Sequence, residues 1–191
     1  MLKPFARRDD PYMLVVGMTG VKMGDRFVQV GCAHGARLAA IAAKVGLSGQ
    51  STAIVPDEAS AARARKGASQ AGVLVEVTIA PPTRLPLGDA SCDLLVIDDT
   101  GGLVGAMRAE DRVGTLRESF RVLRPGGRAT AIGAAARGGL GALFARTRSE
   151  PGFDAMPALQ AEGFKSVRKL ADREGLVFTE GIKPREAGRA G

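Results

Sequence analysis

The stretch FVQVGCAHGARL, residues 27–38, combines three features that decide the fold. A short apolar run is followed by a loop with two glycines, and an alanine-rich segment with helical spacing comes next. This order of strand, glycine loop and helix is typical of the first unit of a nucleotide-binding α/β domain. Gln29 is the only polar residue before the glycines. We therefore ask whether the loop binds a cofactor.

The composition indicates one globular domain. The chain has 191 residues, 45% of them hydrophobic and 25% charged, so a single core of ordinary size is expected. No apolar run reaches the roughly 20 residues that span a bilayer, and the first residues lack the pattern of a signal peptide. Two cysteines, Cys32 and Cys92, give no disulfide framework. These features favour a cytoplasmic protein without a membrane segment.

The net charge of +7 raises the question of an anionic partner such as nucleic acid. Basic residues are spread along the chain, often beside acidic ones. Aromatic residues make up only 4%, so few are available to stack on bases. The pattern therefore favours an ordinary solvated surface over a nucleic-acid interface.

Hydrophobic periodicity predicts strands that alternate with helices. The expected strands are 27–31, 51–55, 73–80, 92–98, 129–134, 165–171 and 176–182, and the expected helices are 12–21, 36–46, 57–72, 109–123 and 157–164. Alternation through the first five strands predicts a parallel sheet with helices on both faces, and the last two strands predict an antiparallel hairpin. The Pro-Gly-Gly run of 124–128 is expected to end the helix before it.

One domain is expected over residues 1–184. It includes an N-terminal helical segment, 1–23, with Asp9 or Asp10 as the helix cap, and it is followed by a flexible tail, 185–191. The glycine- and arginine-rich segment 133–152 is interpreted as a mobile loop or a poorly packed helix.

Three motifs together resemble class I S-adenosylmethionine-dependent methyltransferases. They are VQVGCAHG (28–35), RLPLGDASCDLLVID (84–98) and LRESFRVLRPGGR (116–128), and the resemblance spans about residues 24–184. It implies a three-layer Rossmann-like fold, with a mostly parallel seven-stranded sheet and an antiparallel C-terminal hairpin. A nicotinamide dehydrogenase fits less well, because G-x-G-x-x-G is absent, and a P-loop is excluded because no Gly-Lys-Ser/Thr follows.

The resemblance also implies a site for S-adenosylmethionine across the carboxyl ends of the first strands. The corresponding positions here are Gln29, Gly31, Cys32, Ala33, His34, Gly35, Val55, Pro56, Pro81, Pro82 and Asp98. Where the family usually has an acid before the glycines, an acid for the ribose and an acid near the adenine, this chain has Gln29, Val55 and Pro81. Ala33 replaces the middle glycine. These four departures predict a degraded cofactor site.

Several polar residues remain open to two interpretations. Asp57 would replace the missing ribose acid, or it caps the following helix. His34, the only histidine, would contact a cofactor or an anion, or it is a solvated loop residue. Asp98 and Asp99 are weak candidates for a general base or a metal ligand, or they cap the next turn. One histidine and two cysteines make no convincing zinc site, so no metal is expected.

Two classes of function follow. The first is a methyltransferase-like enzyme acting on a small acceptor, since the sequence shows no inserted substrate domain. The second is a non-catalytic domain of the same fold that binds a partner. A homodimer formed through the terminal strands is a further expectation.

Overall fold

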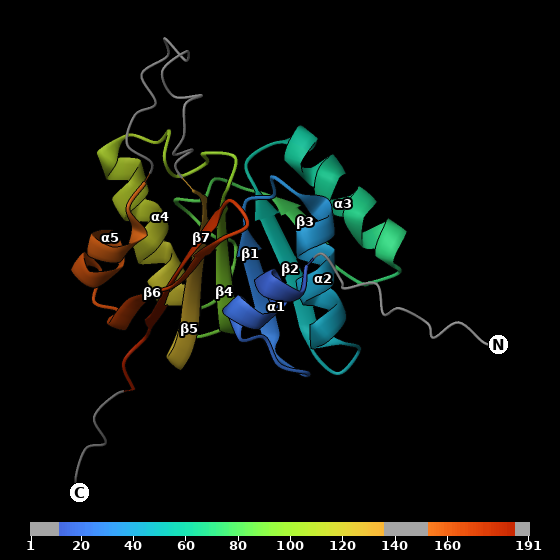
Figure 1. Cartoon of the computed structure of the whole chain (residues 1–191), viewed down its shortest axis with the longest axis horizontal. Helices are drawn as coiled ribbons and strands as arrows, with labels where there is room; N and C mark the ends of the chain where they lie inside the picture. Colours follow the sequence, from blue (N-terminus) through green and yellow to red (C-terminus); the bar gives the residue numbers. More distant parts are fainter. Residues whose placement is uncertain (1–11, 136–152, 186–191) are drawn as a thin grey trace, which may run out of the picture.

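The computed structural model describes residues 12–135 and 153–185 (Figure 1). The strands are β1 (Arg26–Val30), β2 (Gln50–Val55), β3 (Glu76–Ile79), β4 (Cys92–Asp99), β5 (Leu123–Ala134), β6 (Lys165–Arg173) and β7 (Leu176–Ile182). The helices are α1 (Met13–Thr19), α2 (Gly35–Val45), α3 (Glu58–Ala71), α4 (Ala109–Val122) and α5 (Ala155–Ala161).

All seven strands form one sheet in the order β3-β2-β1-β4-β5-β7-β6. The first five are parallel, whereas β7 pairs antiparallel with both β5 and β6. The central strands β1 and β4 are almost entirely buried, as expected for parallel strands covered on both faces. The predicted mostly parallel sheet with an antiparallel C-terminal hairpin is therefore confirmed. The expected homodimer stays a prediction.

Helices cover both faces of the sheet. One apolar cluster joins α1, α2 and α3 to the face that carries Phe27, Val55 and Phe178. A second cluster joins α4, α5 and the segment 80–91 to the face that carries Val30 and Ile97. Figure 1 shows α2 and α3 toward one end of the sheet and α4 and α5 toward the other.

Several predicted boundaries differ from the structure, and two of the differences have a clear physical cause. The strand expected over 73–80 is shorter, because Val73 still belongs to the end of α3, where its N–H bonds to the Ala68 carbonyl, and Leu74 is exposed. Helix α4 ends at Val122 and β5 begins at once. The Pro-Gly-Gly run is instead an irregularity inside β5: Cys92 pairs with Leu123 but Leu94 pairs with Arg128, so residues 124–127 loop out.

A close approach of two helices fixes the start of α2. A methyl group added to Gly35 would collide with the Arg63 backbone, and one added to Gly67 would collide with the Gly35 backbone. The predicted site residue Gly35 therefore allows α2 to pack against α3.

Arg121 on α4 holds the segment that precedes β4. Its guanidinium donates to the carbonyls of Leu85 and Leu87, and it pairs with Asp89 at 2.7 Å and with Glu118 at 2.7 Å. The hydrogen-bonded Glu118 keeps its pKa below the usual value, chiefly through Arg121. This network joins the motif at 84–98 to the motif at 116–128.

Some predictions lie outside the described residues. They are the helix cap at Asp9 or Asp10, the part of the expected loop over 136–152, and the tail over 186–191. No helix in the described part of the chain is long and apolar enough to cross a membrane.

Candidate functional site

The glycine loop between β1 and α2 lies where the strand order reverses direction. Strand β1 lies between β2 and β4. The chain adds β2 and β3 on one side of β1 and then β4 and β5 on the other side. In open α/β sheets, ligands bind at the carboxyl ends of the strands at such a position. Gly31 has a φ of +81°, a conformation that side chains disfavour, and its N–H donates to the Ile54 carbonyl.

Asp98, at the carboxyl end of β4, fixes this loop. Its Oδ2 accepts from the Ala33 N–H at 2.9 Å, and its Oδ1 accepts from the Thr100 N–H at 3.2 Å and from the Thr100 hydroxyl at 2.6 Å. The interpretation of Asp98 as a cap of the next turn is thus confirmed. Ala33 has no positive φ, so its methyl group causes no backbone strain.

Gln29 stabilises the glycine loop through its buried side chain. The side chain is buried, and its Nε2 donates to the Gly31 carbonyl at 2.9 Å. The polar residue at this position therefore hydrogen-bonds with the protein itself.

A cavity of about 180 Å³, the Gly31 cavity, lies beside the loop. Five of the predicted residues line it: Gly31, Cys32, Ala33, Pro56 and Asp98. The rest of the lining is Asp57, which was a candidate for the ribose acid, and four residues that the sequence did not indicate as cofactor contacts: Ser60, Arg63, Gly101 and Leu103. The other predicted residues, which are Gln29, His34, Gly35, Val55, Pro81 and Pro82, do not line it.

Val55 and Asp57, at the end of β2, have different structural roles. Val55 is fully buried in the apolar cluster under α2 and α3, so its side chain belongs to the core. Asp57 caps α3, since its Oδ1 accepts from the Ser60 N–H at 2.7 Å, and this bond lowers its pKa. The interpretation of Asp57 as a helix cap is confirmed.

The turn after β4 packs on the glycine loop. A methyl group placed on Gly31 would lie 2.6 Å from Cδ2 of Leu103, and one placed on Gly101 would lie 3.2 Å from Cβ of Ala33. Arg112 on α4 holds this turn, because its guanidinium donates to the carbonyls of Val104, Gly105 and Met107. Leu103 therefore occupies the space directly over the glycine.

Two arginines, one on α2 and one on α3, contact the segments that border the Gly31 cavity. Arg63 donates to the Cys32 carbonyl at 3.0 Å and to the Ser60 hydroxyl at 2.8 Å. Arg37 donates through Nη2 to the Thr100 hydroxyl at 2.7 Å, while its Nη1 is buried without a partner among the described residues. Both arginines add positive charge at this end of the sheet.

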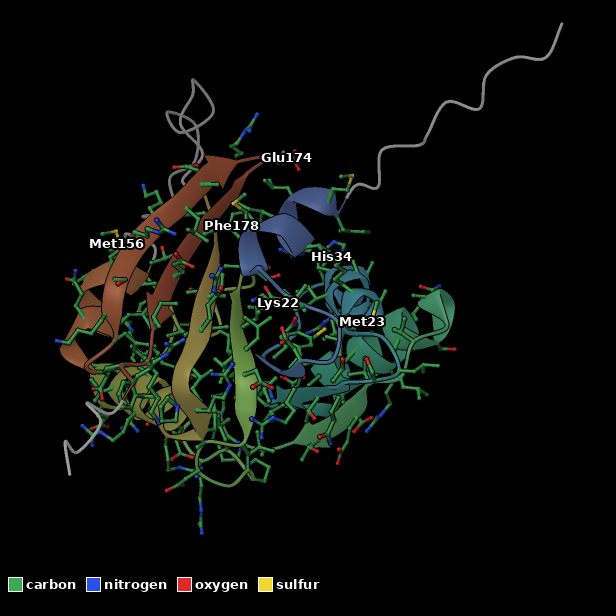
Figure 2. The ribbon with its side chains drawn as sticks, turned by 90° about the horizontal axis from the view of Figure 1, so that it is seen from below. Lys22, Met23, His34, Met156, Glu174 and Phe178 are labelled. Atoms are coloured by element: carbon green, nitrogen blue, oxygen red, sulfur yellow. The ribbon has the colours of Figure 1, made fainter. Side chains whose placement is uncertain are left out.

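Cys32 and His34 differ in their exposure at this loop. Burial, with a contribution from Asp98, raises the pKa of the Cys32 thiol to about 11. His34 is exposed at the start of α2 and makes no side-chain capping bond (Figure 2). The interpretation of His34 as a solvated loop residue agrees with this exposure.

Asp99 points to the opposite face from Asp98. Its Oδ1 accepts from the N–H groups of Val104 at 2.6 Å and Gly105 at 3.1 Å, so it also caps the turn. Burial raises its pKa, and the two backbone hydrogen bonds partly oppose that rise. In the described part of the chain, no group of three His, Cys, Asp or Glu side chains is arranged to hold a metal.

Leu103 and Arg63 are the residues that sequence reasoning missed. Leu103 lies between glycines in TGGLVG, and nothing in that pattern indicates which way the turn folds. Arg63 is one of several basic residues on α3, and its spacing of three from Ser60 was the only available signal.

Solved structures with the same fold are similar to this chain at low identity. A SAM-dependent methyltransferase from Aquifex aeolicus is 20% identical with a TM-score of 0.69, and the match covers 90% of this chain and 89% of that one. The apo form of the S-adenosylmethionine-dependent methyltransferase SibL is 21% identical with a TM-score of 0.66, covering 92% and 55%. The [4+2]-cyclase SpnF is 18% identical with a TM-score of 0.63, covering 91% and 80%.

Comparison with curated proteins gives no match. A family model described as a methyltransferase domain matches residues 28–131, which include the glycine loop, β2 to β4 and most of β5. The resemblance to class I S-adenosylmethionine-dependent methyltransferases is confirmed by this match and by the fold, and S-adenosylmethionine is the cofactor that they support. Because the matched region exceeds half of the chain, the chain belongs to the methyltransferase domain family.

Proposed function

We propose that this protein is an S-adenosylmethionine-dependent methyltransferase-like protein for a small acceptor, and that its cofactor site is degraded. The observation that carries the proposal is the packing of Leu103 over Gly31, with Cδ2 only 2.6 Å from the place of a Gly31 methyl group. A glycine at this position normally lets a ligand approach the backbone. In this chain a leucine side chain fills that approach.

The residues present do not fit S-adenosylmethionine as they are arranged. The Gly31 cavity measures about 180 Å³, below the roughly 300–1,000 Å³ of ordinary small-molecule pockets. At the end of β2 the Val55 side chain is buried in the core and has no atom to accept from ribose hydroxyls. After β3 the Ala80 N–H is already donated to the Val55 carbonyl, and two prolines follow.

The polar groups of the Gly31 cavity are already engaged within the protein. Asp98 accepts from three donors and Asp57 accepts from the start of α3. Arg63 donates to the Cys32 carbonyl and adds a positive charge beside them. The ammonium group of S-adenosylmethionine would therefore compete with these hydrogen bonds, and Arg63 would oppose its charge.

A non-catalytic binding or scaffold role is the second candidate. It is favoured by Arg112, whose three carbonyl contacts hold the turn with Leu103 in place over the loop. The fold by itself does not fix the activity, since one structure with the same fold is described as a [4+2]-cyclase.

Calorimetric titration with S-adenosylmethionine and S-adenosylhomocysteine tests the proposal. The unchanged protein, Leu103→Ala and the control Leu74→Ala would be compared. Leu74 is 79% exposed and lies two residues before β3, away from the loop. We expect millimolar or weaker binding by the unchanged protein and by Leu74→Ala, and binding tighter by about tenfold or more for Leu103→Ala.

The outcomes separate the candidates. Micromolar binding by the unchanged protein would show that the site is intact and would contradict its degradation. No binding by any of the three proteins would favour the non-catalytic role. Tighter binding by Leu103→Ala alone would support a methyltransferase-like site that the leucine obstructs.

A further inference from the structure

A second cavity lies at the same edge of the sheet, on the face covered by α4 and α5. It measures about 330 Å³, and we name it the Asp99 cavity after the residue at its β4 side. Its lining includes Asp99, Gly133, Phe153, Asp154, Met156 and Lys169. The volume lies within the range of about 300–1,000 Å³ that is usual for small-molecule sites.

Small residues of β5 form the floor of the Asp99 cavity. Gly133 has no positive φ, and a methyl group added to it would meet no atom within 4 Å. Backbone geometry therefore does not require glycine there. The missing side chain leaves space instead, and this space lies next to Asp99, the partner of Gly133 in the β4–β5 register.

Asp99 offers one carboxylate oxygen to this space. Oδ1 is occupied by the N–H groups of Val104 and Gly105. A methyl group on Gly105 would lie 3.5 Å from Oδ2 and 3.7 Å from Cβ of Phe153, so Oδ2 and the Phe153 side chain border the same space. The ion pairs of the described residues give Asp99 no cationic partner.

The neighbouring cations are engaged elsewhere. Arg112 donates to three carbonyls and lies over the Phe153 ring, 5.6 Å from its centroid. The Lys169 side chain is 53% exposed and its Nζ lies 4.0 Å from Asp172. Asp154 adds a second carboxylate at the start of α5. A buried carboxylate that forms no ion pair with another described residue, in a cavity of this size, favours a ligand with positive charge.

Apolar side chains from the start of α5 complete the cavity. Phe153 and Met156 are partly buried, and Met156 lies by the β6–β7 hairpin in Figure 2. An aromatic ring and a thioether suit the hydrocarbon part of a ligand, and both also tolerate a nearby cation.

We propose that the Asp99 cavity binds a small organic amine, with its ammonium against Asp99 Oδ2 and its hydrocarbon part against Phe153 and Met156. Binding of this amine does not rest on the proposed function. The Asp99 cavity and the Gly31 cavity lie on opposite faces of β4, as Asp98 and Asp99 do, so each can be tested alone.

The test is calorimetric titration with phenethylamine, compared with the neutral 2-phenylethanol and the anionic phenylacetate, in the absence of any cofactor. Asp99→Asn keeps an oxygen for the Val104 and Gly105 N–H groups but removes the charge. Gly133→Val fills the floor of the cavity, and Glu58→Gln, at an exposed acid of α3 that pairs with Arg65, is a control outside the lining. Thermal unfolding by circular dichroism identifies any variant that fails to fold.

We expect phenethylamine to bind more tightly than the two other probes. Its affinity should fall by about tenfold or more in Asp99→Asn, be lost in Gly133→Val and stay unchanged in Glu58→Gln. Two results would overturn the proposal. One is equal binding by folded Asp99→Asn or Gly133→Val, and the other is no binding by the unchanged protein at a phenethylamine concentration of about 10 mM.

Discussion

The Asp98 carboxylate accepts a hydrogen bond of 2.9 Å from the N–H of Ala33, 65 residues earlier in the chain. This bond ties the carboxyl end of β4 to the glycine loop after β1. The other carboxylate oxygen holds Thr100 at the start of the next turn. One buried side chain therefore sets the relative position of both segments that border the Gly31 cavity.

Asp98→Ala is expected to lower the free energy of unfolding by about 1–3 kcal/mol, because three donors would lose their acceptor in a buried place. Urea unfolding followed by circular dichroism measures the change. Asp172→Ala is the control: it removes an exposed acid on β6 and should stay within about 0.5 kcal/mol. Equal effects of the two substitutions would show that the Asp98 bonds contribute little.

Gly67→Ala is expected to destabilise the protein by about 1–3 kcal/mol, because its methyl group would meet the Gly35 backbone where α2 and α3 cross. Gly17→Ala in α1 is the matched control, since a methyl group there meets nothing within 4 Å. This control should stabilise by about 0.4–1 kcal/mol, through the smaller entropy of the unfolded chain. Urea unfolding of both variants checks the difference in sign.

Arg121→Ala is expected to destabilise by about 1–3 kcal/mol and to release the segment 85–89 from α4. Hydrogen exchange of the Leu85 amide, which donates to Glu118, should become faster than in the unchanged protein. Arg117→Ala on the same helix removes a side chain that is 71% exposed, and it should leave this exchange unaltered. If Leu85 exchanged at the same rate in both variants, Arg121 would not hold the segment.

Asp93 provides a prediction about pH. Its carboxylate accepts from Arg26 and Arg124, and these hydrogen bonds hold its pKa well below the usual range. A depressed pKa in the folded state stabilises the protein above the unfolded pKa of about 3.9, and this contribution is lost as the pH falls through the folded pKa.

Asp93→Asn should therefore destabilise by about 0.5–1 kcal/mol at pH 7, a range typical of exposed ion pairs. The difference from the unchanged protein should shrink as the pH is lowered from 4 toward 2. Thermal unfolding at several pH values measures this difference. Asp154→Asn, at an exposed acid outside this cluster, is the control. A difference that does not depend on pH would contradict the ionic origin of the effect.

Local signals in the sequence predicted the parts of the fold that depend on neighbouring residues. Asp57 is followed by a helix with Ser60 at the right distance, and the structure shows this cap. Gly46 ends α2 as expected. The alternation of strands and helices predicted the parallel sheet. The limits of β3 were wrong, because Val73 and Leu74 have the composition of a strand, while the end of α3 and solvent exposure decide their state.

The candidate site could be predicted only in part. Positions compared with the family pointed to Gly31, Cys32, Ala33, Pro56 and Asp98, and these five do line one cavity. Val55 was placed there too, but its side chain faces the core. The two residues that shape the cavity most, Leu103 and Arg63, come from a turn and a helix face whose direction no local pattern specifies.

The sequence by itself determined the order of strands and helices, the glycine loop, and the absence of acids at the positions where the family has them. These follow from side-chain type and spacing, which act over a few residues. Only the tertiary structure decided that Leu103 covers Gly31 and that Asp98 and Asp99 serve different cavities. Contacts of this kind join residues far apart in the chain, and their geometry depends on how the whole sheet twists and packs.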